Sequence, residues 1–131
     1  MIVAAVALTQ TWRAHRAVES PAGSPILQIR SGDLSIVLLS PTGTLHQGRN
    51  SYTIEFRGAN GALIDVGTVH KSANMAMPGM VMSGGVEVSR TTVPGRYEAT
   101  AEFGMAGAWQ MALEWDGPAG RGSARFEGTV R

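Results

Sequence analysis

The sequence predicts an all-β fold, an antiparallel β-sandwich of about seven strands. Apolar and polar residues alternate with a period of two through most of the chain after residue 25. Glycine and proline, 17 and 6 residues respectively, interrupt this alternation at short intervals. No segment after residue 25 has a helical period. Strands with one apolar and one polar face indicate two sheets packed face to face, each with one solvated side.

The first predicted strand, residues 34–39, is apolar on both faces and ends at a Pro-Thr-Gly turn. The second, residues 50–57, alternates cleanly, with Tyr52, Ile54 and Phe56 on the inner face. Gly58 to Gly61 then form a turn, since Asn-Gly tolerates positive φ. Residues 63–74 are less regular because Val69 has the opposite parity to Val66. A bulge near Gly67 is expected to reconcile them.

The second half of the chain predicts four further strands at 86–89, 97–103, 109–116 and 124–130. Glycine-containing turns separate the last three of them, and Pro94-Gly95 precedes the strand that contains Tyr97. Acidic residues occupy alternate, outward positions and are interpreted as solvated. Trp109, Met111 and Trp115 share the opposite parity and are expected in the core.

Composition excludes several functional classes. The net charge is +1, with basic and acidic residues scattered singly, so no nucleic-acid partner is predicted. Cysteine is absent, which removes disulfides and thiolate chemistry. The sequence contains neither a Gly-x-Ser-x-Gly motif nor a phosphate-binding glycine loop. The protein is therefore predicted not to be an enzyme. Ten of the eleven basic residues are arginine, and the single lysine, Lys71, is interpreted as codon bias.

Residues 1–25 are expected to form a segment separate from the domain at 26–131. Met1 to Leu8 is an apolar run too short to span a bilayer, and no basic residue precedes it. Arginines follow it, and Ser20 to Pro25 has the composition of a linker. The run is interpreted as the remainder of an export signal or membrane anchor. A short helix packed on the domain is the alternative.

Four of the seven methionines lie within eight residues, at Met75, Met77, Met80 and Met82. The intervening Pro78-Gly79 suits a type II turn. In a two-residue hairpin the four side chains would share one face, with Met75 opposite Met82. Because type II turns splay hairpin strands, a looser, irregular loop is the alternative. Thioethers are soft ligands that favour Cu(I), so these four methionines are the predicted metal ligands.

The methionine segment has two other interpretations. Methionine also fills irregular core gaps, and an exposed methionine patch can dock on a partner. Met105 lies in another loop and is a candidate further ligand. His46 and His70 are single histidines, interpreted mainly as surface residues, and His15 lies in the N-terminal segment.

The order of these motifs resembles the YtkA-like domain, which is related to FixH-like proteins. The motifs are Leu34 to Pro41, Asn50 to Arg57, Met75 to Met82, Pro94-Gly95-Arg96-Tyr97, and Met105-Ala106-Gly107-Ala108-Trp109. The resemblance covers roughly residues 31–131. It implies a bacterial, exported or membrane-anchored, immunoglobulin-like sandwich with no catalytic residues to carry over. Many members have a histidine within the methionine segment, and this chain has none there.

The resemblance also implies a functional setting. Family members occur alone or fused to periplasmic adaptors of metal-efflux pumps, and FixH-like relatives are tied to copper supply for haem-copper oxidases. The expected function is Cu(I) handling, in delivery or as an efflux accessory, in the periplasm or another extracytoplasmic space. Expected partners are metal-efflux or oxidase-assembly proteins. A metal-free docking module of a membrane complex is the alternative.

Overall fold

The computed structural model describes residues 23–131, which form eight antiparallel strands and no helix. None of these residues belongs to a helix long and apolar enough to cross a membrane. The expectations for residues 1–22 lie outside the described part of the chain. The strands are β1 (Ser24–Ser31), β2 (Leu34–Ser40), β3 (Gly48–Arg57), β4 (Thr68–Met77), β5 (Met80–Arg90), β6 (Arg96–Phe103), β7 (Gly107–Gly117) and β8 (Gly120–Val130).

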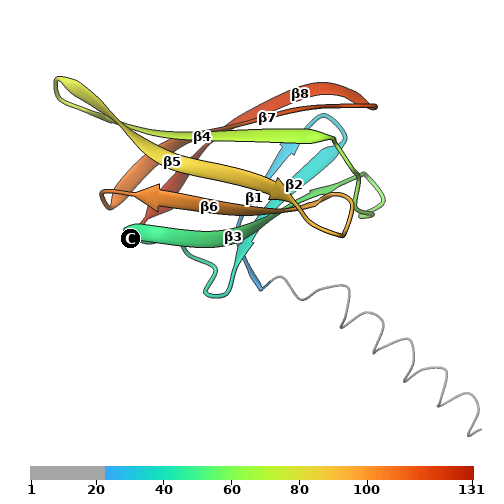
Figure 1. The fold of residues 1–131 in the computed structure, drawn as a ribbon, viewed down its shortest axis with the longest axis horizontal. Helices are drawn as coiled ribbons and strands as arrows, with labels where there is room; N and C mark the ends of the chain where they lie inside the picture. The colour runs from blue at the N-terminus through green and yellow to red at the C-terminus, as the bar shows by residue number, and fades with distance from the viewer. Residues whose placement is uncertain (1–22) are drawn as a thin grey trace, which may run out of the picture.

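The strands follow the order β1-β2-β3-β6-β5-β4-β7-β8, which folds into two facing layers (Figure 1). Strand β5 belongs to both layers. Its first half pairs with β4 as far as Gly84, and its second half pairs with β6 from Gly85 onward. The outer strands β1 and β8 approach each other, where the Ser31 hydroxyl donates a hydrogen bond to the Ser123 carbonyl at 3.4 Å. The predicted all-β, antiparallel, two-layered class is confirmed, and the assembly is nearly closed.

Position 84, where β5 changes layer, leaves little space for a side chain. A Cβ there would lie 3.1 Å from the Glu102 carbonyl oxygen and 3.4 Å from Cζ3 of Trp109. The β5 backbone therefore passes directly over the Trp109 ring as it crosses from one layer to the other. The methionine-bearing part of β5, from Met80 to Met82, ends just before this crossing.

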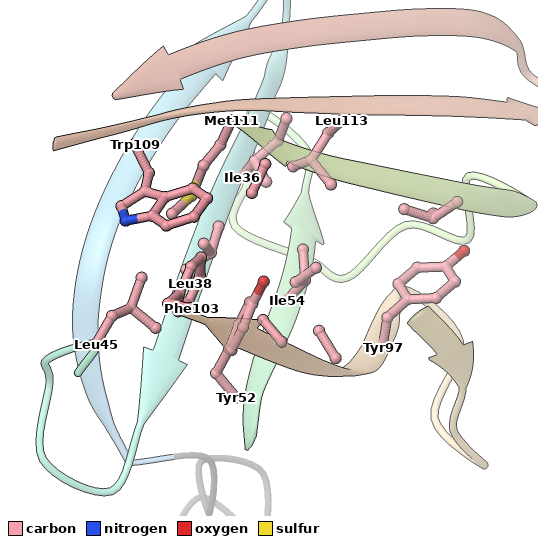
Figure 2. Close-up of a cluster of buried hydrophobic side chains, with 14 of the residues drawn as sticks. Ile36, Leu38, Leu45, Tyr52, Ile54, Tyr97, Phe103, Trp109, Met111 and Leu113 are labelled. Atoms are coloured by element: carbon pink, nitrogen blue, oxygen red, sulfur yellow. The ribbon is translucent and has the colours of Figure 1, made fainter. Parts of the chain in front are cut away.

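The inward positions of both layers meet in one core (Figure 2). Its largest fully buried side chains include Trp109, Tyr52, Tyr97, Phe56 and Phe103. Phe103 and Trp109 meet edge to face, with ring centroids 5.1 Å apart. Such a pair contributes about 0.5–1.5 kcal/mol beyond the area that it buries. Trp109, Met111 and Trp115 are buried, as their alternation predicted.

Strand β1 is an element that the sequence interpretation missed, and it begins two residues before the expected domain boundary. Its pairing with β2 shifts register between Pro25 and Leu27. The shift places the adjacent Ile26 and Leu27 both against the core, which breaks the period-two pattern. A strict alternation of apolar and polar residues therefore does not predict this strand.

The bulge expected near Gly67 is wrong. Gly67 precedes β4 in the connecting loop and has φ of +90°. A Cβ there would lie 2.3 Å from the Asp116 carbonyl oxygen, so the loop closes tightly on the end of β7. Val66 and Val69 are both buried because they lie in different elements, one in this loop and one in the strand. The change of parity marks where the strand starts.

Candidate metal site

The predicted methionines occupy a regular two-residue hairpin that joins β4 to β5. Met75 lies opposite Met82, and Met77 lies opposite Met80. Gly79 has φ of +78°, and no residue other than glycine has positive φ among the described residues. Pro78 followed by a positive-φ glycine is the arrangement of a type II turn. The predicted register is confirmed, and the alternative of a looser loop is wrong.

The hairpin projects as an arm beyond the two layers (Figure 1). Directly opposed residues of an antiparallel pair have Cβ atoms about 4.5–5.5 Å apart, so the two side chains of each methionine pair start side by side. Exposure rises along the arm: Met75 is 9% exposed, Met77 and Met82 are half-buried, and Met80 is 55% exposed. We call Met75 and Met82 the inner pair and Met77 and Met80 the outer pair.

The inner pair packs against the turn between β6 and β7. A Cβ on Gly104 would lie 3.4 Å from Sδ of Met82, and a Cβ on Gly107 would lie 2.8 Å from Cε of Met75. The two glycines bracket Met105, which is 41% exposed. The sequence pattern named Met105 as a candidate but gave no sign that its turn adjoins the hairpin.

The histidines lie apart from the methionines. His70 is on β4 but has the opposite parity to Met75, so it faces outward and is exposed. His46 is exposed, and its backbone N–H donates to the Asn50 side chain at 2.9 Å. Within residues 23–131, no three histidine, aspartate or glutamate side chains gather in a way that would hold a metal ion. The methionine hairpin therefore stays the candidate metal site among the described residues.

A buried lysine is the main feature that the sequence interpretation missed. Lys71 on β4 is 8% exposed, and its Nζ donates a hydrogen bond to the Tyr52 hydroxyl of the opposite layer. Nζ also lies 3.5 Å from Sδ of Met111 and 4.4 Å from the centroid of the Tyr52 ring. Figure 2 shows the Tyr52 hydroxyl directed into the core, toward the layer that contains Met111. No carboxylate is among these contacts.

Burial shifts both ionisable groups of this pair toward their neutral forms. Removal from water lowers the pKa of Lys71 from 10.5 to about 7 and raises the pKa of Tyr52 well above 10.0. The single lysine was interpreted as codon bias. Its parity, shared with Val69, Ala73 and Met75, was the signal that placed it inside. Lys71 also lines the groove between β4 and β5 that is described below.

One acidic residue expected on the solvated face is buried. Glu55 lies on the outer face of β3, where Nε of Arg96 is 2.8 Å from Oε2 and Nη2 of Arg57 is 3.0 Å from Oε1. The expectation of a solvated carboxylate is wrong here, because β3 is a central strand whose outer face is covered by these two side chains. Both carboxylate oxygens are paired, which is the arrangement of a structural ion pair.

A groove of about 660 Å³ lies where β5 leaves β4. Its lining combines apolar valines with basic residues and acidic ones, namely Arg49, His70 and Lys71, and Glu87 and Glu98. This mixture of charges does not indicate any one class of ligand. The methionine hairpin therefore remains the candidate site.

Comparison with known protein families identifies the family of this chain. A family model described as YtkA-like matches residues 30–114, which is more than half of the 131-residue chain. The matched region includes the methionine hairpin and the Met105 turn. It confirms the resemblance that the motifs indicated. A search of curated proteins finds no match.

Proposed function

The chain belongs to the YtkA-like family, and from that premise we propose that it binds Cu(I), or a related soft ion, through Met75, Met77, Met80 and Met82. The observation that carries the proposal is the register of the β4–β5 hairpin. It pairs the four thioethers two by two on one face of a projecting arm. Soft thioether ligands favour Cu(I) over the harder biological cations.

The increase in methionine exposure along the arm is compatible with a site that binds an ion and transfers it to a partner. The inner pair is sheltered by the β6–β7 turn, while Met80 at the end of the arm is open to solvent. A partner can approach the end of the arm without disturbing the core. The proposed role is therefore to store or deliver the ion, in copper supply or as an efflux accessory, and not to transform a substrate.

The proposal includes an extracytoplasmic location and a membrane-associated partner that handles the same ion. Copper is the cofactor or cargo of this role. Thioethers bind without losing a proton, so the affinity for Cu(I) should change little between pH 6 and pH 8. A histidine or thiolate site would weaken as its ligands become protonated.

The direct test replaces all four hairpin methionines by leucine. Met and Leu have similar volumes, so each change should cost less than about 1.5 kcal/mol and keep the hairpin apolar. Competition with a chromophoric Cu(I) chelator should show one ion bound by the wild type and none by the variant. Equal binding by both proteins would refute the assignment. Met111→Leu, which alters a buried methionine away from the hairpin, is the control and should bind normally.

The second candidate function is metal-free docking, favoured by one specific observation. Val81 is 64% exposed on the face of the arm opposite to Met80 and Met82. An apolar side chain at this position would not contribute to a metal site, whereas an exposed apolar surface is typical of a docking site. The same four-leucine variant separates the two functions, because leucine keeps the apolar surface and removes the sulfur. Docking would survive this change, and Cu(I) binding would not.

A further inference from the structure

A third methionine, Met105, lies in the turn against which the inner pair packs. Met82 and Met75 extend toward the two ends of the β6–β7 turn, at Gly104 and Gly107 respectively. Met105 is the residue immediately after Gly104. A methionine side chain has three rotatable bonds and reaches several ångströms from its Cα, so it can turn toward either neighbour.

The turn is held in place by two side chains from different elements. Nε1 of Trp109 donates to the Met105 carbonyl at 3.0 Å, and Nε2 of Gln47 donates to the Gly104 carbonyl at 3.1 Å. Trp109 is fully buried, so the first of these bonds ties the turn to the core. The backbone of Met105 is thereby fixed beside the inner pair, while its side chain stays partly exposed.

The absence of side chains at both flanking positions keeps this space open. A Cβ at Gly107 would fall 2.8 Å from the Met75 methyl group and would push the thioether away. A Cβ at Gly104 would sit at ordinary contact distance from the Met82 sulfur. The two glycines thus leave room for the inner pair to approach the turn that contains Met105.

We infer that Met105 is a ligand of the bound ion and completes a three-thioether site with Met75 and Met82. This inference rests on the proposed soft-metal function and adds to it a residue from outside the hairpin. The outer pair, Met77 and Met80, then serves capture and release at the end of the arm. Three ligands from two separate connections hold the ion where the backbone is supported on both sides.

The test uses Ag(I), a diamagnetic soft ion, and the full chain with ¹³C-labelled methionine methyl groups. At one equivalent, the methyl signals of Met75, Met82 and Met105 should shift together, and those of Met77, Met80 and Met111 should move less. A Met105 signal that stays in place while the hairpin signals shift would overturn the inference and leave the proposed function intact. No shift of any hairpin methionine would overturn both.

Matched variants give the second measurement. Met105→Leu should lower Cu(I) affinity by roughly tenfold or more, because even the loss of an outer partner of a metal ligand has an effect of that size. Met80→Leu, an equally conservative change at an exposed methionine, should lower it by less than about threefold. The Trp109 near-ultraviolet circular dichroism confirms that the turn is preserved in both. Equal affinities for Met105→Leu and wild type would overturn the inference.

Discussion

The two ends of strand β4 differ in how they depart from the usual burial of apolar residues and exposure of charged ones. One end buries a lysine, and the other leads to exposed apolar side chains. At its first half, Lys71 places an amine in the core, against Tyr52 and Met111. Its second half leads into the projecting hairpin, where Met80 and Val81 at the start of β5 are exposed to solvent. Lysine is among the residues least often buried, and large apolar side chains on an arm are equally unusual. Strand β4 and the hairpin that it enters therefore contain both of these unfavourable features.

The difference lies in what surrounds each feature. Lys71 is enclosed by both layers, so the free energy needed to desolvate its amine lowers the stability of the whole domain. Met80 and Val81 are exposed at the end of the hairpin, so their apolar surface lowers solubility until a partner or ion covers it. A residue whose substitution changes stability belongs to the fold, whereas one whose substitution changes only binding belongs to the function. The predictions below separate the two ends by this criterion.

The largest expected effect is that of Lys71→Met, which should stabilise the protein. A pKa lowered from 10.5 to about 7 corresponds to about 4–5 kcal/mol of lost stability at neutral pH. Methionine removes this cost but leaves the buried Tyr52 hydroxyl without its partner, at about 1–3 kcal/mol. The free energy of unfolding in urea should therefore rise by about 3 kcal/mol at pH 7. A loss of stability would show that the amine is not desolvated as its surroundings indicate.

The pH dependence of stability gives the control. Between pH 7 and pH 10 the unfolded chain keeps the Lys71 proton and the folded chain does not, so stability should rise with pH by up to about 1.4 kcal/mol per unit. Above pH 10 the raised pKa of Tyr52 opposes this trend, because only the unfolded chain then loses the phenolic proton. The rise between pH 7 and pH 10 should be absent from Lys71→Met. Parallel curves for the two proteins would contradict the assignment.

Tyr52→Phe should have the next largest effect. It removes the hydroxyl that accepts a hydrogen bond from Lys71 and leaves Met111 as the remaining close contact of the amine. Stability should fall by about 2 kcal/mol at pH 6, where the amine is charged, and by about 1 kcal/mol at pH 9, where it is neutral. Chemical denaturation at the two pH values measures both. An equal loss at the two values would mean that the charge state of Lys71 does not matter.

The glycines of the β6–β7 turn should give a smaller effect that links the turn to the site. Gly107→Ala meets the Met75 methyl group and adopts φ of +134°, so it should cost about 1–2 kcal/mol and weaken Cu(I) binding. Gly104→Ala has no positive φ and only an ordinary contact with Met82, so it is the matched control. Thermal unfolding and chelator competition should both rank Gly107→Ala below Gly104→Ala. The reverse order would show that the inner pair does not depend on the turn.

The smallest effect on stability is expected at the end of the arm. Met80→Leu and Val81→Thr alter exposed side chains with few neighbours, so each should change the unfolding free energy by less than about 0.5 kcal/mol. Val81→Thr should also leave Cu(I) affinity unchanged, since Val81 faces away from the methionines. A stability change of more than about 1 kcal/mol in either variant would mean that the arm packs on the domain.

Local patterns predicted much of the fold, because alternation and turn chemistry act over a few residues. Pro78-Gly79 was enough to predict the hairpin register, and Tyr52, Ile54 and Phe56 were placed correctly inside. Strand β1 was missed because its register shift disrupts the alternation on which such predictions depend. Glu55 was misplaced because parity specifies a face but not what covers it.

The site was predictable only in part for the same reason. The four hairpin methionines are close in sequence, so their shared face followed from register alone. The contact with the Met105 turn depends on the strand order, which brings β6 and β7 to either side of the β4–β5 pair. The partner of Lys71 comes from the opposite layer, nineteen residues away. Both contacts join residues that are far apart in the sequence, so no local sequence pattern could predict them.

X-ray absorption at the copper edge of the Cu(I)-loaded protein tests the central claim most directly. If the hairpin holds the ion through thioethers, sulfur should account for the whole first coordination shell, and the spectrum should be the same at pH 6 and pH 8. The four-leucine variant, prepared in the same way, should retain no copper. A shell containing histidine nitrogen, or copper retained by the four-leucine variant, would contradict the account.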